Sequence, residues 1–496
     1  MRRRDTSIAA SKDGGELTNT EELSEVPELP DVRAASMRPV LKPGRWYWPV
    51  VGALVAVVAV GVVAWVTQLH EGLGAAGYNN HAFWAIYIAD VVTFIGVSYG
   101  GAVVSAILRL TGASWRAPLT RIAEATAVVT VIIGGSFIIP HLGRPERILE
   151  LIYRPNLSSP IFWDFVAVST YAFASIVFFF LPLMPDLAMA RDRLTAANRP
   201  RLARLCGTLS CRWQAKPSQR RRLDGAIGLV AIMVIPLAVS VHSVLSWAFT
   251  LTSRPWWHES IWAPYFVVAA LYSGIALVII VVAVMRRIWG LKAFITDRHL
   301  VRLGFILAPF GAAYLYLTIA DFLPGSYVGE NGVANVFAQV LAGRYALWFW
   351  LFVFAGLIVP LLIIALPWTR RAPFIVTAAA LVVGSLWIKR MVMVVAPANY
   401  GRVSGVFGSY HFTWISACVT LAGVAAIPLL LLLVFRVVPI LSVTEMEEMA
   451  ARKEQEAMRE GADRALAEIE RRHDAGESLD VQVEEAEMTP VGRADA

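Results

Sequence analysis

A histidine and an aspartate stand on either side of a short hairpin between two long apolar stretches. His141 closes the first stretch, and Asp164 lies near the start of the second. Ionisable side chains at membrane depth are costly to bury and commonly serve a function. Histidine titrates near neutral pH, and a neighbouring carboxylate can orient it or accept a second proton. We therefore expect both residues to lie at one depth and to take protons from a shared ligand. The alternative is that they only cap helices at the interface.

The residue types around this hairpin suit an apolar ring with an apolar tail, such as a quinol. Oxidation of a quinol releases two protons and two electrons, so His141 and Asp164 would be the catalytic pair. Arginines of the hairpin can pair with carboxylates, and aromatic side chains can form apolar walls. The residues that we expect to bind quinone are Ile138, Arg144, Arg147, Phe162, Trp163 and His242.

The composition calls for membrane helices on both sides of the hairpin. Of the 496 residues, 57% are hydrophobic and 16% are charged, and the mean hydropathy is +0.59, as in membrane proteins. Apolar runs of about 20 residues are long enough to cross the hydrocarbon core. The sequence predicts an all-α membrane protein with ten spans, at Val50–Val66, His81–Leu108, Ile122–His141, Phe162–Leu183, Ala226–Trp247, Pro264–Met285, Gly304–Phe322, Ala346–Leu366, Phe374–Val395 and Phe412–Phe435.

The basic residues are divided unequally between the loops on the two sides. Loops 109–121, 183–224, 286–302 and 367–372 carry 20 Lys and Arg, whereas the loops on the other side carry 6. Basic loops remain in the cytoplasm, so this bias predicts cytoplasmic termini and an outward-facing hairpin. The net charge of +7 therefore reflects topology and does not indicate nucleic-acid binding. The basic loop 183–224 is expected at anionic lipid headgroups.

The chain divides into three parts by composition. Residues 1–46 are a polar cytoplasmic tail that we expect to be disordered or held on a partner. Residues 47–436 form the transmembrane domain in a prokaryotic plasma membrane. Residues 437–496 form a charged cytoplasmic tail, with spacing suited to a surface helix over Glu445–His473.

Other ionisable residues within the spans are candidates for a proton path. Asp90 is interpreted either as a hydrogen-bonded structural carboxylate or as a path member. Glu124 could pair with Arg121 or Arg116, or relay protons. Snorkelling toward the interface is the alternative for Lys389 and Arg390. The candidates for the path are Asp90, Tyr99, Glu124, Asp321 and Arg390.

The histidines gather toward one side of the membrane. His81, His141, His242 and His411 fall near outer ends of spans. A cytochrome b with two haems needs axial ligands at two depths, which this pattern does not provide, and a single outer haem is the alternative. Three cysteines are too few for an iron–sulfur cluster with four thiolates. Cys206 and Cys211 share a loop, where two unpaired thiols are expected in preference to a zinc site or a disulfide.

Several short motifs resemble those of the NrfD/PsrC family, and the likeness is greatest to the ActC-type subunit of alternative complex III. It covers residues 50–435 and is most specific where the His-Leu-Gly-Arg-Pro and Trp-Asp elements occur together. The motifs are Gly96-Val97-Ser98-Tyr99-Gly100-Gly101, Trp115-Arg116, Ala123-Glu124-Ala125, His141-Leu142-Gly143-Arg144-Pro145, Ser159-Pro160, Trp163-Asp164 and Val168-Ser169-Thr170-Tyr171.

The resemblance implies two four-helix bundles with two flanking helices and a quinol site on the outer face, built on His141 and Asp164. It implies no haem or iron–sulfur cluster in this chain. The implied partners are a ferredoxin-like iron–sulfur subunit on the outer face, further membrane subunits including a second NrfD-like chain, and a cytochrome c subunit. Tyr99 stands where ActC-type chains often have histidine, and Lys389 where they often have an acid. A transmembrane proton pathway is therefore not transferred on likeness alone.

The function expected from these features is oxidation of menaquinol or another quinol, with electrons passing to the iron–sulfur partner and proton translocation as a further step. One alternative is the same site working as a quinone reductase for a hydrogenase, formate or molybdopterin-type enzyme. A second alternative is a secondary transporter, which would instead place broken helices at the membrane midplane.

Overall fold

The computed structural model describes residues 29–330, 332–401 and 403–474, and these form two compact units. Residues 27–446 make up the larger unit, which contains all the long apolar helices. The described part of the smaller unit is the continuation of α18 (Val443–Asp474) from residue 447. A helix over Glu445–His473 was predicted and is confirmed.

Ten helices of the described residues are long and apolar enough to cross a membrane. This confirms the predicted all-α architecture with ten spans. Helix ends shift most where the chain continues past the apolar run, as for α10 (Pro217–Thr250), which extends the expected span at both ends. Proline in its first turn is compatible with helix initiation because the missing N–H needs no partner there.

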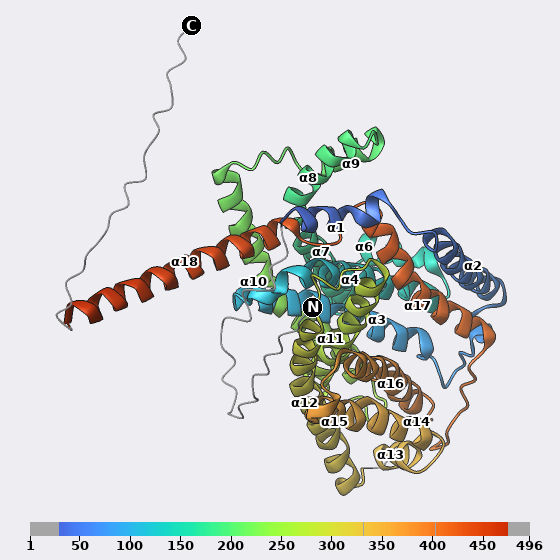
Figure 1. The fold of residues 1–496 in the computed structure, drawn as a ribbon. Coiled ribbons are helices and arrows are strands. Elements are labelled where there is room, and N and C mark those ends of the chain that lie inside the picture. Colours follow the sequence, from blue (N-terminus) through green and yellow to red (C-terminus); the bar gives the residue numbers. More distant parts are fainter. Residues whose placement is uncertain (1–28, 331, 402, 475–496) are drawn as a thin grey trace, which may run out of the picture. The chain divides into compact units, whose positions relative to one another are not determined.

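The first bundle consists of α3 (Ile86–Leu110), α4 (Ala117–Ser136), α7 (Pro160–Phe180) and α10, each packed against its two neighbours (Figure 1). Helix α4 is continued by the short α5 (Ile138–Leu142). The hairpin to α7 then contains α6 (Glu150–Tyr153). This order places the ends of α5 and the start of α7 at the same end of the bundle.

The second bundle is built from helices that follow in sequence. Its members are α11 (Trp262–Ile288), α12 (Asp297–Val328), the broken helix α14 (Ala346–Leu351) to α15 (Val359–Ala365), and α16 (Ala372–Ala398). A π-helical turn, Phe352–Ile358, joins α14 to α15. The Tyr272 hydroxyl donates to the Gly356 carbonyl at 2.9 Å, which satisfies a backbone group in this irregular turn. Helix α13 (Val333–Leu341) covers one end.

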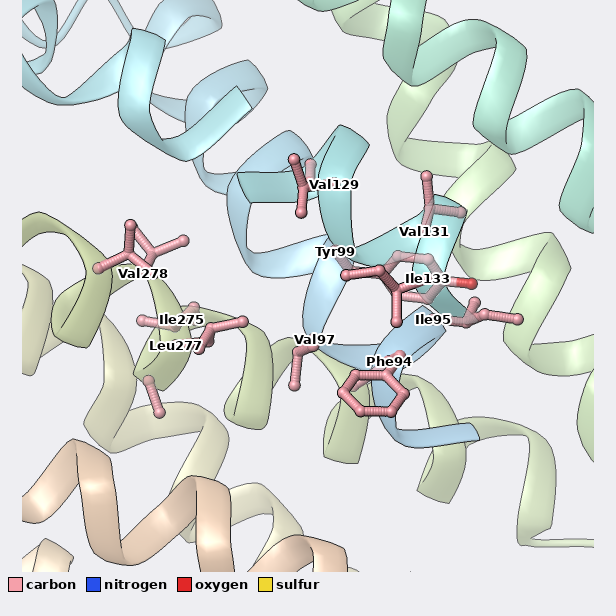
Figure 2. Packing of buried hydrophobic residues seen from close by; sticks show 14 of the residues in the cluster. Phe94, Ile95, Val97, Tyr99, Val129, Val131, Ile133, Ile275, Leu277 and Val278 are labelled. Atoms are coloured by element: carbon pink, nitrogen blue, oxygen red, sulfur yellow. The ribbon is translucent and has the colours of Figure 1, made fainter. Parts of the chain in front are cut away.

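Helices α3 and α11 form the seam between the bundles. Gly100 and Gly274 face each other there, and a Cβ on Gly100 would overlap the backbone of Gly274. Small residues of this kind allow membrane helices to approach closely. Figure 2 shows apolar side chains packed at this seam, from α3 (Phe94, Ile95, Val97, Tyr99), α4 (Val129, Val131, Ile133) and α11 (Ile275, Leu277, Val278).

A pair of helices, α2 (Tyr47–Glu71) and α17 (Trp414–Phe435), flanks the first bundle. Helix α17 contacts α3 and α4, whereas much of α2 is exposed. This arrangement of two bundles and two flanking helices agrees with the architecture that the sequence resemblance implied.

Parts of both segments that were expected to be tails belong to the larger unit. Residues 29–41 form α1 (Leu29–Leu41), in which Val32, Met37 and Val40 are buried. The Ser36 hydroxyl donates to the Leu441 carbonyl at 2.9 Å. Residues 438 and 440–443 are also buried. Residues 29–46 were therefore wrongly grouped with the polar tail, because a short amphipathic helix with proline has no strong apolar run.

Candidate functional site

His141 lies on α5 and contacts a tyrosine from the segment between α2 and α3. Its Nδ1 is 3.4 Å from the Tyr78 hydroxyl. The Tyr78 oxygen accepts the Tyr87 backbone N–H at 3.3 Å, so the Tyr78 proton is free to point at His141. Burial raises the pKa of Tyr78 well above its usual range, so the phenol stays protonated at neutral pH. Helix α5 is tied to α2, because the Gln68 amide donates to the Pro140 carbonyl at 2.8 Å.

Asp164 lies in the second turn of α7, at the end of the first bundle that also carries His141, here called the His141 end. Its Oδ1 is buried and has no hydrogen-bond partner among the described residues. Its charge acts on Tyr99 of α3. No hydrogen bond or ion pair joins it to His141 in the described part of the chain. A buried acceptor without a donor is energetically costly, so this oxygen is suited to receive a ligand hydroxyl.

The side chains expected to wall the site lie at the surface of the larger unit. Trp163 is 39% exposed, and its indole N–H donates to the Leu157 carbonyl at 2.6 Å. Ile138 and Phe162 are half-buried. The expected site is therefore open on one side, toward the membrane or a partner.

Two arginines of the hairpin do not form the ion pairs that the sequence suggested. Arg144 and Arg147 are exposed and form no ion pair with another described residue. The expected pairing with carboxylates is absent because Asp164 is recessed in α7 while the hairpin projects from the bundle.

Tyr99 and His242 form a fully buried pair inside the first bundle. The Tyr99 hydroxyl is 2.7 Å from His242 Nδ1. The Tyr171 ring packs edge-on against Tyr99, with centroids 4.8 Å apart, and the Ser98 hydroxyl donates to Tyr171 at 3.2 Å. Asp164 lies on α7 about two turns before Tyr171, and its electrostatic influence reaches Tyr99.

His242 lies deeper than the sequence suggested. Its partner Tyr99 is about 20 Å of helix rise from Ile86, where α3 begins. Helix α10 continues to Thr250, past the end of the apolar run, so His242 lies about two turns from the helix end and is fully buried. His242 therefore belongs to the buried Tyr99 cluster and does not line the surface beside Trp163.

Arg390 enters the same region from α16, and its Nη2 donates to the Ser273 hydroxyl at 3.0 Å. A Cβ on Gly96 would lie 2.8 Å from Arg390 Nη2 and 3.2 Å from His242 Nε2. The glycine thus lets a guanidinium and an imidazole approach the α3 backbone together. Arg390 Nη1 and His242 Nε2 are both buried without a hydrogen-bond partner among the described residues. Arg390 is 3% exposed, so the snorkelling alternative is wrong for it.

Lys389 points into the second bundle and is fully buried, so it does not snorkel either. Its Nζ lies 4.5 Å from the ring centroid of Trp256 and 5.3 Å from that of Tyr265. Trp256 also donates its indole N–H to Asp321 at 2.9 Å. The charges of Lys389 and Asp321 act on each other. An ammonium enclosed by aromatic faces and a nearby carboxylate is a compensated charge.

Asp90 is held by two donors from other helices. Trp387 donates to one carboxylate oxygen at 2.8 Å and Thr420 to the other at 2.6 Å. Its charge also acts on Tyr78, Tyr87 and Tyr410 near the His141 end. Asp90 is thus a hydrogen-bonded carboxylate, as one interpretation held. It lies about one turn along α3 from Tyr87, whose ring stacks on that of Tyr78 with centroids 5.7 Å apart.

Glu124 accepts a hydrogen bond from the Ser105 hydroxyl at 2.6 Å. The pairing expected with Arg121 or Arg116 is wrong, because both arginines have other carboxylates. Arg121 pairs with Asp186 of α8 (Leu183–Ala196) at 2.9 Å. Arg116 pairs with Glu445 at 2.7 Å.

Glu445 closes the end of the first bundle opposite to His141, here called the Glu445 end. It pairs with Arg109 and Arg116 and accepts a hydrogen bond from Thr120 at 3.1 Å. Burial alone would raise the pKa of Glu445, but the charges of Arg109, Arg116 and Arg121 outweigh burial and hold it below its usual range. This carboxylate is therefore ionised and locks the start of α18 onto the bundle.

Two partly open, mainly apolar cavities share Trp387 in their lining. One of about 520 Å³ lies between α3, α11, α16 and α17, with Thr420 in its wall. The other, of about 400 Å³, is lined by aromatic residues that include Trp348 and Tyr410, together with Arg344. Neither is lined by His141 or Asp164, so each is a rival location for an apolar ligand.

The sequence interpretation missed Tyr78, Gln68 and Glu445. Tyr78 and Glu445 lie outside the apolar runs, where hydropathy does not predict which way a side chain points. An intramembrane glutamine such as Gln68 is rare enough to have been singled out. The described residues contain no group of three His, Cys, Asp or Glu positioned to hold a metal ion. Cys206 and Cys211 are not bonded to each other.

Fold and site together define a multi-pass helical membrane protein with ionisable groups at one open end and within two bundles. The sequence model of the family "Polysulphide reductase, NrfD" matches residues 74–400. The chain therefore belongs to the NrfD polysulphide reductase family.

Similar proteins include membrane subunits of redox complexes. A Halobacterium salinarum protein, provisionally named as a dimethyl sulfoxide reductase membrane subunit, is 30% identical over 71% of this chain and 78% of its own length. A selenate reductase subunit of Mesobacillus selenatarsenatis is 25% identical over 71% and 82%. The Hdr-like menaquinol oxidoreductase integral membrane subunit of Archaeoglobus fulgidus is 24% identical over 65% and 72%.

Proposed function

We propose that this chain is the quinol-binding membrane subunit of a respiratory oxidoreductase, and that it oxidises menaquinol or a related quinol at the His141 end. The observation that carries the proposal is the presence of two proton acceptors at that end, His141 beside Tyr78 and the unpartnered Oδ1 of Asp164. The names of the relatives, which include reductase subunits and a menaquinol oxidoreductase subunit, support it.

The proton chemistry follows from the two local environments. A quinol gives up two protons and two electrons. His141 can accept one proton at Nε2 in the tautomer whose Nδ1–H donates to the Tyr78 hydroxyl oxygen. The Asp164 Oδ1 can accept the other proton. Each acceptor also has an inner neighbour to which a proton can move, Asp90 by way of the tyrosines near His141 and Tyr99 beside Asp164.

Electrons need a carrier outside this chain. The exposed Trp163 and the half-buried Ile138 and Phe162 leave the site open on one side. We propose that this open side is covered by a ferredoxin-like iron–sulfur subunit. Because basic loops remain in the cytoplasm, we place the His141 end outside and both termini inside. An assembly of the alternative complex III type would add a second NrfD-like chain and a cytochrome c subunit.

The direction of electron flow is also part of the proposal. Two relatives are named as subunits of dimethyl sulfoxide and selenate reductases. A membrane subunit in a complex that reduces a terminal acceptor must deliver electrons, which favours quinol oxidation over quinone reduction.

A proton path through the first bundle is a further part of the proposal. Asp90 and Tyr99 adjoin the two site residues, and Glu124 lies toward the Glu445 end with Ser105 as its donor. Asp321 and Arg390 have neighbours in the second bundle and the seam. We propose Asp90, Tyr99 and Glu124 as the proton-carrying members, with Arg390 setting the field around Tyr99 and His242.

The test is quinol-dependent reduction of the partner subunit by the intact complex. His141→Ala and Asp164→Asn are each expected to abolish this activity while the complex still assembles and still accepts electrons from an artificial donor to the partner. His81→Ala, an exposed histidine before α3, is the matched control and should retain normal turnover. Normal turnover in both site variants would refute the proposal.

A further inference from the structure

Helices α8 and α9 (Pro200–Leu209) form a basic groove at the Glu445 end of the larger unit. The groove encloses about 990 Å³, and no carboxylate contributes to its lining. Four of the residues that line it are arginines, Arg191, Arg199, Arg204 and Arg212. We name it the α8–α9 groove.

The groove is carried by an anchored hairpin. Asp186, in the first turn of α8, pairs with Arg121 of α4 at 2.9 Å, and both side chains are buried. Leu187 and Leu194 of α8 are buried on the same side, as is Cys206 of α9. The backbone reverses through Asn198 at a φ of 54°, a left-handed conformation that asparagine tolerates. The arginines are thus presented from a fixed frame.

The charges in the groove are largely uncompensated. Arg191 contacts Asp192 at 2.8 Å in an exposed pair. Arg199, Arg204 and Arg212 form no ion pair with another described residue. A further positive charge lies nearby, because Arg199 is among the groups that lower the pKa of Arg436, after burial. Several guanidinium groups converging on one hollow repel one another unless an anion lies between them.

The position of the groove restricts what that anion can be. The hairpin follows α7 directly and is pinned to the start of α4, so the groove adjoins the membrane surface at the Glu445 end. Guanidinium forks match phosphate oxygens, with two parallel hydrogen bonds per group. Basic pockets beside membrane helices on the cytoplasmic side recognise phospholipid headgroups.

We propose that the α8–α9 groove is a binding site for a phosphate-bearing anion, either the headgroup of an anionic phospholipid or a soluble phosphate compound. The site does not depend on the quinol proposal, since it lies at the opposite end of the bundle from His141.

The experiment uses the full-length chain, delipidated in a neutral detergent. One arm titrates phosphatidylglycerol, with phosphatidylcholine as reference, by native mass spectrometry. The other arm titrates ATP and inorganic phosphate by equilibrium dialysis. The groove variant is Arg199→Gln with Arg204→Gln. The matched control is Arg193→Gln with Arg201→Gln, which removes equal charge from the same hairpin outside the groove lining.

The wild-type chain is expected to bind phosphatidylglycerol over phosphatidylcholine, and the groove variant to bind it about 30-fold more weakly. The control variant should change by about threefold or less. Groove-dependent binding of ATP or phosphate, without phosphatidylglycerol binding, would assign the site to a soluble anion. Equal losses in both variants, or no binding of any probe by the folded wild-type chain, would overturn the proposal. Circular dichroism checks that both variants are folded.

Discussion

The two bundles surround their buried ionisable groups differently. In the second bundle, Lys389 Nζ lies over the ring of Trp256 and is attracted by the charge of Asp321, although Lys389 Nζ and Asp321 Oδ1 form no hydrogen bond with a described residue. In the first bundle, Asp164 Oδ1 and His242 Nε2 also have no hydrogen-bond partner among the described residues, and no opposite charge of the described chain acts on either residue. Uncompensated polar atoms in a membrane interior persist where function requires them. This difference agrees with our proposal that the first bundle carries the chemistry and the second supports it.

We expect the largest loss of stability from a substitution that removes Lys389 from beside Asp321. Lys389→Met leaves the Asp321 carboxylate buried without its counter-charge, at a cost of about 3–5 kcal/mol. We expect little folded protein after detergent extraction, measured by yield and thermal unfolding. Adding Asp321→Asn should restore most of the yield, because the uncompensated charge is then gone. A stable single variant would show that the pair does not support the second bundle.

We expect a smaller loss of stability at the Glu445 end, where Glu445 pairs with Arg109 and Arg116. Because the pKa of Glu445 is held below its usual range, its ionised form stabilises the fold above the unfolded pKa of about 4.3. That contribution is lost as the pH falls through the folded pKa.

Glu445→Gln should therefore cost about 2 kcal/mol at pH 7, because the charged hydrogen bonds from Arg109 and Arg116 are lost. The measurement is denaturant unfolding from pH 7 to pH 3, over which the difference from wild type should shrink. Glu460→Gln, which breaks the exposed pair with Arg464, is the control and should change nothing measurable. A difference that grew toward low pH would contradict this account.

Each bundle contains a buried tyrosine whose removal can be compared by its effect on quinol turnover. Tyr99→Phe removes the hydroxyl that contacts His242 and adjoins Asp164. We expect quinol turnover to fall about tenfold, in the range of a lost proton-transfer group, with assembly unchanged. Tyr314→Phe makes the same change in the second bundle and should leave turnover normal. Equal effects of the two substitutions would remove the distinction between the bundles.

Much of the architecture could be predicted from the sequence. The ten spans follow from the length and apolarity that a bilayer imposes. The positions of His141 and Asp164 at the same end follow from the short hairpin between their spans. Local patterns of this kind need no knowledge of how the helices are rotated.

The partners of the buried charges could not be predicted in this way. Lys389 and Arg390 are adjacent in sequence, yet they point into different regions, which depends on the rotation of α16. The arginines expected to pair with Glu124 pair instead with Asp186 and Glu445, which come from distant segments of the chain. Tertiary packing decides which groups pair with these buried side chains, and a single sequence does not show it directly.

The central claim is that quinol binds at the His141 end. The most direct test is photo-crosslinking of the intact complex with an azido-quinone, followed by peptide mapping. The account predicts labels within residues 138–147 and 160–165 that unlabelled quinol competes away. Labels confined to the aromatic cavity beside Trp348 and Tyr410, with none on the hairpin, would contradict it.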